Sequence, residues 1–300
     1  MLNEKQTAQM MAKLTRLQDT LQELMFEKVD EVPVCWYKTE ERLHRIPDDG
    51  LFTPCKKGDQ WGGEGAYCWF KGSYTVPDRL AGQTLYLYPH VGGYEGFMWL
   101  DGKPFGNYAS KLGNHYCNYL FDNAKAGDVH DIAVEYYAGH YVIGCSPLTS
   151  SPMSDFLYQV ESMDICVKNE QAADFLFDLK VLCQAVECMD KDSYRRADIL
   201  AGLYEVHNTI YYSYEDAGRE AFFEGLARAS GILKEKLSRV NSQTTPFAGL
   251  VGHSHMDTAW LWTVPETEKK CARTYSKQIS LMEQYPEYIF TQSSAFHSDM

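Results

Sequence analysis

The stretch that decides the fold runs from residue 70 to residue 93 and reads FKGSYTVPDRLAGQTLYLYPHVGG. It is followed by FMWLDGKPFG at 97–106 and by AKAGDVHDIAVEYY at 124–137. Short runs rich in aromatic and β-branched residues alternate with Gly, Pro and Asp, and Asp101-Gly102 suits a tight hairpin turn whose two central residues need positive φ. This spacing predicts an antiparallel β-sandwich over residues 31–167.

Helical periodicity flanks the predicted sandwich on both sides. Residues 1–30 carry apolar side chains at three- and four-residue spacing, which predicts one amphipathic helix. Its apolar stripe consists of Met10, Leu14, Leu17, Leu21 and Leu24. A second stripe begins at Ala172, and helical patterns continue to about residue 237, so we expect a helical connector over 168–242. The linker NSQTTP at 241–246 marks the boundary to a last segment, 243–300.

The composition of the 300 residues is that of a globular protein, with 45% hydrophobic and 23% charged residues. A formal charge of −13 argues against binding to nucleic acid or to an anionic membrane surface. The nine cysteines are scattered without a CxxC pair, and no apolar stretch suits a signal peptide or a membrane span, which predicts a cytoplasmic protein with reduced thiols. Among the abundant aromatic residues, Trp61, Trp69 and Trp99 are expected in the sandwich core rather than on a binding face.

Residues 247–262 carry the chemistry and read FAGLVGHSHMDTAWLW. The apolar run up to Gly252 predicts a buried parallel strand, and polar residues follow at its C-terminal end, where parallel α/β folds place their ligands. Side chains of an extended chain repeat every second residue, so His253, His255 and Asp257 are expected on one side. Imidazole and carboxylate donors suit a cation such as Zn²⁺. The rival hypothesis is a hydrogen-bonded polar cluster that caps the strand.

The segment GHSHMDTAWLW at 252–262, with its continuation ETEKKCARTYSKQISLMEQYPEYIFTQSSA at 266–295, resembles the start of the catalytic domain of glycoside hydrolase family 38 α-mannosidases. The similarity runs from about residue 247 to the last residue. The strand pattern at 70–137 resembles the galactose-binding-like jelly rolls attached to many glycosidases. The layout as a whole is similar to the cytosolic and bacterial branch of the family. It implies a multidomain α and β protein: an N-terminal helix, an antiparallel sandwich, a helical connector and, over 243–300, the beginning of an α/β-barrel catalytic domain.

The resemblance implies a retaining, metal-dependent glycosidase that cleaves terminal α-linked mannose from oligosaccharides or N-glycan-derived glycans. His255 and Asp257 match the family's ligands of one divalent metal ion, zinc first and cobalt as the alternative. Trp260 matches the tryptophan that lines the mannose site, and His253 is expected to have a structural role behind the ligands.

The resemblance also implies that the catalytic residues lie outside the 300 residues. The family's nucleophile and its acid/base residue follow this motif at a distance, so both are expected downstream of Met300. We therefore expect no catalytic residue within this chain, not even Asp299. The chain is expected to be an N-terminal portion of an α-mannosidase that is inactive alone.

Two other functions stay open at this point. In a metal-dependent hydrolase of the amidohydrolase type, an HxH pair ends the first barrel strand, so His253 and His255 would both be ligands. In a non-enzymatic carbohydrate-binding protein, the sandwich alone would bind sugar. The expected partners are α-mannosides and related oligosaccharides, without nucleic acid or membrane, and a homo-oligomer stays open.

Overall fold

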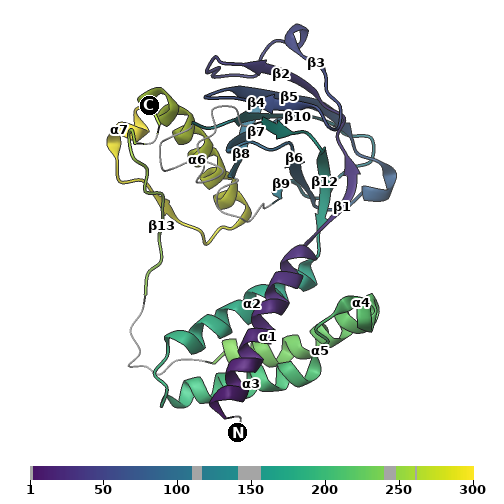
Figure 1. Cartoon of the computed structure of the whole chain (residues 1–300), viewed down its shortest axis with the longest axis vertical. Coiled ribbons are helices and arrows are strands. Elements are labelled where there is room, and N and C mark those ends of the chain that lie inside the picture. Colours follow the sequence, from purple (N-terminus) through teal and green to yellow (C-terminus); the bar gives the residue numbers. More distant parts are fainter. Residues whose placement is uncertain (1–2, 110–116, 141–156, 240–247, 261) are drawn as a thin grey trace. The chain divides into compact units, whose positions relative to one another are not determined.

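The computed structural model describes residues 3–109, 117–140, 157–239, 248–260 and 262–300. The chain forms two compact units, one of residues 1–27 and 168–247 and the other of residues 28–167 and 248–300. Figure 1 shows the helices of the first unit and the sheets of the second. None of the helices in the described ranges combines the length and the apolar character that crossing a membrane requires.

The first unit is a bundle of helices. It contains α1 (Glu4–Glu23), α2 (Glu170–Cys188), α3 (Tyr194–Thr209), the short α4 (Tyr214–Ala217) and α5 (Arg219–Leu237). α1 begins at a capping box, in which the Asn3 side chain accepts a hydrogen bond from the Gln6 N–H and the Gln6 side chain accepts one from the Asn3 N–H. The helices bury one common core, which includes Leu14, Leu17, Leu21, Phe175, Leu179, Phe222 and Leu226.

The N-terminal helix is shorter than the single helix expected over residues 1–30. α1 ends at Glu23, and the chain then forms the strand β1 (Phe26–Glu31), which lies beside β12 (Ser162–Lys168) at the edge of a sheet. The apolar spacing of the helix does not foresee this end, because β1 is stabilised by pairing with a strand far along the chain. Tertiary pairing therefore overrides the local helical pattern.

The second unit contains the predicted sandwich, and the strand pairings described within the sandwich itself are all antiparallel. One sheet has the order β3-β2-β5-β10-β7-β8 and the other β1-β12-β6-β9, with a small β11-β4 pair beside them. The remaining strands are β2 (Cys35–Thr39), β3 (Thr53–Pro54), β4 (Gln60–Gly62), β5 (Tyr67–Thr75), β6 (Leu85–His90), β7 (Glu95–Leu100), β8 (Lys103–Ala109), β9 (Asn118–Phe121), β10 (Val129–Tyr137) and β11 (Leu157–Gln159). Two 3₁₀ turns, Asp49–Leu51 and Asp78–Leu80, lie between them. The fold class is the one predicted.

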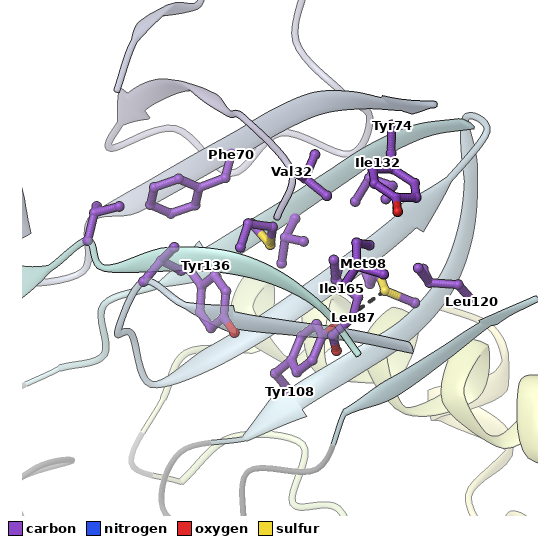
Figure 2. Close-up of a cluster of buried hydrophobic side chains, with 14 of the residues drawn as sticks. Val32, Phe70, Tyr74, Leu87, Met98, Tyr108, Leu120, Ile132, Tyr136 and Ile165 are labelled. Carbon is purple, nitrogen blue, oxygen red and sulfur yellow. Dashed lines mark hydrogen bonds between the residues drawn. The ribbon is translucent and has the colours of Figure 1, made fainter. Parts of the chain in front are cut away.

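The β7–β8 hairpin turns at Asp101 and Gly102, with φ of 49° and 75°, as their sequence predicts. Alternate side chains of the two sheets meet in one core, drawn in Figure 2. The labelled residues are Val32, Phe70, Tyr74, Leu87, Met98, Tyr108, Leu120, Ile132, Tyr136 and Ile165. Of the three tryptophans expected in the sandwich core, Trp61 lies in the core between the two sheets. Trp69 and Trp99 are also buried, but in a separate cluster with Phe97 and Ala133.

The C-terminal segment of the second unit contains β13 (Gly252–His253), α6 (Val264–Gln284), β14 (Phe290–Thr291) and the short α7 (Ala295–Ser298). β13 and β14 pair in parallel, as expected for this segment. The expected burial of the preceding apolar run is wrong, because Leu250 and Val251 are 89% and 55% exposed. Within the described ranges β14 is the single strand that pairs with β13, so these side chains lack a covering layer. α6 packs along β8 and β7 (Figure 1).

Candidate functional site

The residues expected to bind metal follow β13 in the loop that leads to α6. The Nε2 atom of His255 lies 3.5 Å from Oδ1 of Asp257, and the two side chains are 85% and 45% exposed. His253 is engaged elsewhere, since its Nε2 lies 3.0 Å from the hydroxyl of Ser293, two residues after β14. The structure therefore brings His255 and Asp257 together and ties His253 to the neighbouring strand end.

The separation of His255 and Asp257 fits a shared metal ion. Two ligand atoms that each lie about 2.1 Å from a tetrahedral ion are about 3.4 Å apart, close to the 3.5 Å between Nε2 and Oδ1. Imidazole nitrogen and carboxylate oxygen are both donors that zinc accepts. Over the described ranges no three His, Cys, Asp or Glu side chains come close enough to hold an ion together. The pair would thus supply two ligands to such an ion, and the other coordination positions would be open to water or sugar hydroxyls.

Trp260 lies three residues after Asp257 and is 68% exposed. Its ring centroid is 5.9 Å from that of Trp262, and the two rings are close to perpendicular at 81°. Trp262 is partly buried. An exposed indole next to a polar pair offers an apolar face on which the C–H groups of a sugar ring can pack. The geometry is therefore compatible with the sugar-binding role expected for Trp260.

The last two residues of the chain, Asp299 and Met300, follow α7 directly. Asp299 caps the C-terminal end of this short helix, and both residues are exposed. The geometry thus gives Asp299 a place at a helix end and no contact with the His255–Asp257 pair among its hydrogen bonds and ion pairs in the described residues. The nucleophile and the acid/base residue expected downstream of Met300 stay a prediction, which the described residues do not test.

Two buried side chains to which the sequence analysis gave no role form hydrogen bonds with this loop. Thr267 of α6 donates its hydroxyl hydrogen to the backbone oxygen of Thr258 and accepts a hydrogen bond of 3.0 Å from Nε1 of Trp262. His297 of α7 places its Nε2 atom 3.0 Å from the hydroxyl of Thr258. Thr267 lies in the first turn of the expected helix and in the stretch that carries the family resemblance, but neither observation gave it a role. His297 belongs to no motif.

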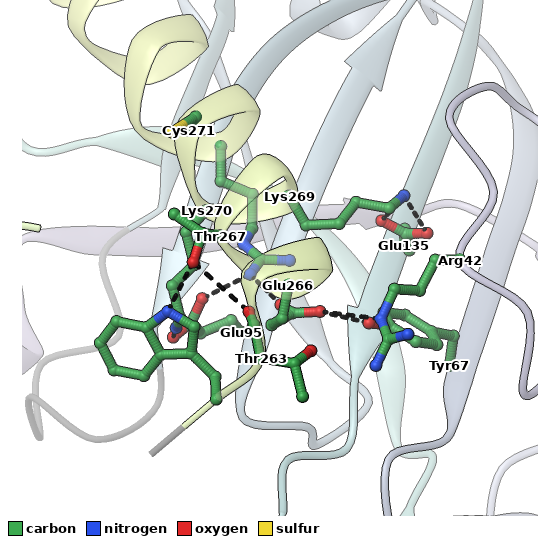
Figure 3. A network of polar contacts seen from close by, with 12 residues as sticks. Arg42, Tyr67, Glu95, Glu135, Thr263, Glu266, Thr267, Lys269, Lys270 and Cys271 are labelled. Atoms are coloured by element: carbon green, nitrogen blue, oxygen red, sulfur yellow. Dashed lines mark hydrogen bonds and ion pairs between the residues drawn. The ribbon is translucent and has the colours of Figure 1, made fainter. Parts of the chain in front are cut away.

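One face of α6 carries charged side chains that are buried against the outer face of the six-stranded sheet (Figure 3). Glu266, Lys269 and Arg273 follow the spacing i, i+3, i+7, which places them on the same side of the helix. Lys269 donates to both carboxylate oxygens of Glu135 on β10, at 2.8 and 2.9 Å. This bidentate pair is almost completely buried, and burial raises the pKa of Glu135 although the Lys269 ammonium opposes the shift.

The remaining contacts of this face converge on Glu95 of β7 and on Glu266. Arg273 lies 2.8 Å from Oε2 of Glu95 and also binds Glu266, and Lys270 binds the other oxygen of Glu95. Tyr67 of β5 donates its hydroxyl hydrogen to Glu266. Burial raises the pKa of Glu95, but Arg273 and Lys270 outweigh it and hold that pKa below its usual value. Glu95 is therefore ionised at neutral pH.

Lys277 continues the same face of α6 but meets a neutral partner. Its Nζ atom donates to the side-chain oxygen of Asn118 at 2.5 Å, and the Asn118 amide group donates to the backbone oxygen of Asn107 at 2.6 Å. Burial disfavours the charged ammonium and lowers the pKa of Lys277 to about 8. The ion pairs of the described residues include no carboxylate that offsets this effect.

Two protein-family models match the chain. Residues 248–298 match the N-terminal domain of glycosyl hydrolases family 38, and residues 23–166 match the jelly roll domain of α-mannosidases. The two matched ranges coincide with the segment after the linker and with the sandwich. The first contains the His255–Asp257 pair and α6.

Curated relatives with similar sequences are named α-mannosidases. Alpha-mannosidase 2C1 of Homo sapiens is 30% identical over 247 residues, which cover 81% of this chain and 23% of that protein. Alpha-mannosidase G of Dictyostelium discoideum is 28% identical over 249 residues, which cover 81% and 22%, respectively. Alpha-mannosidase of Saccharomyces cerevisiae is 24% identical over 237 residues, which cover 76% and 21%. The chain thus spans less than a quarter of the length of these relatives.

Among solved structures, a β-glucuronidase from Ruminococcus gnavus aligns with 48% of this chain and 28% of its own, at 12% identity and a TM-score of 0.32. A likeness this low carries no argument about the fold or the function.

The first prediction concerns the buried pair of Lys269 and Glu135. Lys269→Met leaves the Glu135 carboxylate buried without its partner, so we expect the free energy of unfolding to fall by about 3–5 kcal/mol. The double variant Lys269→Met/Glu135→Leu removes both charges and is expected to recover most of that loss. Urea unfolding followed by tryptophan fluorescence measures both, because all six tryptophans belong to the second unit.

The matched control is Lys57→Met, which removes the exposed ion pair with Glu161 in the same unit. Its expected effect is below about 1 kcal/mol. A Lys269→Met variant as stable as this control would contradict the burial of the pair.

The second prediction concerns the titration of Lys277. Because its folded-state pKa lies below that of an unfolded lysine, the folded state binds this proton less tightly, and the contribution of Lys277 makes the protein more stable as pH rises from about 8 to about 10.4. After reductive ¹³C-methylation, the NMR signal that Lys277→Met removes should titrate near pH 8. A midpoint near that of exposed lysines would contradict the burial of its amine.

Proposed function

Because the chain belongs to glycoside hydrolase family 38, whose jelly roll and N-terminal domain it carries, we propose that it serves as an α-mannosidase. The proposed reaction is the metal-dependent, configuration-retaining removal of terminal α-linked mannose from oligosaccharides. The observation that carries the proposal is the pairing of His255 with Asp257 at 3.5 Å, in an exposed loop at the C-terminal end of a parallel strand. Chemistry at this end of a strand is typical of α/β barrels.

We assign the metal and sugar contacts to three side chains of the loop. His255 and Asp257 hold one divalent cation, zinc first and cobalt as the alternative, and Trp260 packs against the sugar ring. The cation, when bound, polarises the oxygens that coordinate it. His253 has a structural role, in which it joins the end of β13 to Ser293.

The proposal assigns neither the nucleophile nor the acid/base to a residue of this chain. Both belong to sequence that would follow Met300 in a longer protein. The role of the 300 residues in the proposed reaction is therefore to bind the cation and the sugar.

The cytoplasm is the proposed location. The eight cysteines in the described part of the chain are free thiols, as expected for a reducing compartment.

The two rival functions have no specific observation in their favour. An amidohydrolase-type site needs His253 and His255 as joint ligands, whereas the structure pairs His255 with Asp257 and His253 with Ser293. A sugar-binding sandwich needs exposed aromatic residues, whereas Trp61, Trp69 and Trp99 are buried.

The third prediction separates the ligands from the histidine beside them. Zinc titrated into the chain by calorimetry should bind to the parent, and His255→Ala and Asp257→Ala should each abolish measurable binding, because each removes one of two ligands. His253→Ala is the matched control, since it removes an imidazole from the same strand end, and it should bind zinc nearly as well as the parent. Binding that is lost with His253→Ala but kept with Asp257→Ala would favour the amidohydrolase alternative.

The fourth prediction tests the activity itself. An aryl α-mannoside should be hydrolysed by the chain when it is expressed with whatever coding sequence continues it, and ¹H NMR should show the α-anomer of mannose as the first product, because the proposed reaction retains configuration. The 300-residue chain alone is the comparison. A folded, zinc- or cobalt-loaded extended protein without activity on α-mannosides would overturn the proposed function.

A further inference from the structure

The loop between β13 and α6 is held at two points by a single side chain. The Thr267 hydroxyl donates to the backbone oxygen of Thr258 and accepts from the indole N–H of Trp262. Thr258 and Trp262 lie on either side of Trp260 in the sequence, and Thr258 directly follows Asp257. One hydroxyl group therefore closes the part of the loop that carries the proposed sugar contact and borders one proposed metal ligand.

The side chain that makes these contacts is itself rigidly placed. Thr267 is completely buried in the first turns of α6, next to Glu266, which is bound by Tyr67 and Arg273. Lys270, one turn further on, lies 4.3 Å from the centre of the Trp262 ring while it pairs with Glu95. The Trp262 indole is thus fixed by its N–H and by its ring face, and both contacts come from α6.

We propose that Thr267 is a positioning residue, whose hydroxyl fixes the loop so that Asp257 and Trp260 lie at the site that binds metal and sugar. The inference deepens the proposed function and rests on it. Thr267 forms no hydrogen bond with Asp257 or Trp260. It acts through the backbone of Thr258 and the indole of Trp262. Hydrogen bonds that orient ligand-bearing groups control metal affinity although they do not touch the ion.

The proposed positioning effect depends on the hydroxyl group of Thr267 and not on the size of its side chain. Thr267→Val keeps the shape of the side chain but leaves the Thr258 carbonyl and the Trp262 N–H without their partner. Thr267→Ser keeps the hydroxyl and loses one methyl group. Ser280→Ala is the matched control, because Ser280 is a buried hydroxyl on the same helix that bonds to Gln284, far from the loop.

The test is zinc titration by calorimetry on the 300-residue chain, with thermal unfolding of the same variants in the absence of zinc. We expect Thr267→Val to weaken zinc binding about 10-fold, the lower end of the range for residues that orient metal ligands. Thr267→Ser and Ser280→Ala should bind zinc like the parent chain. Should Thr267→Val fail to fold, Trp262→Phe carries the test, since it removes the indole N–H, together with part of the ring, and leaves Thr267 in place.

The outcomes separate the two hypotheses. If Thr267→Val lowers the unfolding temperature but leaves the zinc affinity unchanged, the positioning role is wrong and the metal site still stands. If Thr267→Val does not fold, unchanged zinc affinity in Trp262→Phe leads to the same conclusion. Zinc affinity that does not depend on His255 would contradict the proposed metal site, and the positioning role with it. Weaker binding in Thr267→Val that Thr267→Ser restores supports the inference.

Discussion

The interaction on which the second unit depends is the set of buried ion pairs between α6 and the outer face of the six-stranded sheet. A helix that buries charged side chains loses hydration at each of them, and only close, multiple contacts replace it. α6 supplies such contacts: Lys269 donates to both carboxylate oxygens of Glu135, and Arg273 and Lys270 both pair with Glu95. A displacement of the helix by one turn would separate these groups. The ion pairs therefore select one position of the helix.

The position of α6 determines the geometry of the candidate site. Thr267 and Lys270 of this helix hold Thr258 and Trp262 in the loop that carries the His255–Asp257 pair. Since Lys270 also binds Glu95 of β7, a continuous series of contacts leads from the jelly roll to the loop. The jelly roll thus bears on the candidate site through the placement of α6.

Local patterns of the sequence predicted the parts of the structure that local physics determines. Strand alternation and the turn at Asp101-Gly102 predicted the sandwich. The two-residue repeat predicted His253, His255 and Asp257 on one side, and the structure brings only His255 and Asp257 together, while His253 bonds to Ser293. The pairing of β1 with β12 could not be predicted, because the partner strand lies more than 130 residues away. For the same reason a helix with Lys269 and Arg273 on one face resembles a solvent-exposed surface until Glu135 and Glu95 are placed opposite it.

Native-state hydrogen exchange tests the docking of α6 most directly. If the buried ion pairs hold the helix against the sheet, the amides of residues 267–277 in α6 open together with those of β5 and β10, with similar protection and similar dependence on denaturant. Amides of α6 that exchange rapidly while the central strands stay protected would contradict the account.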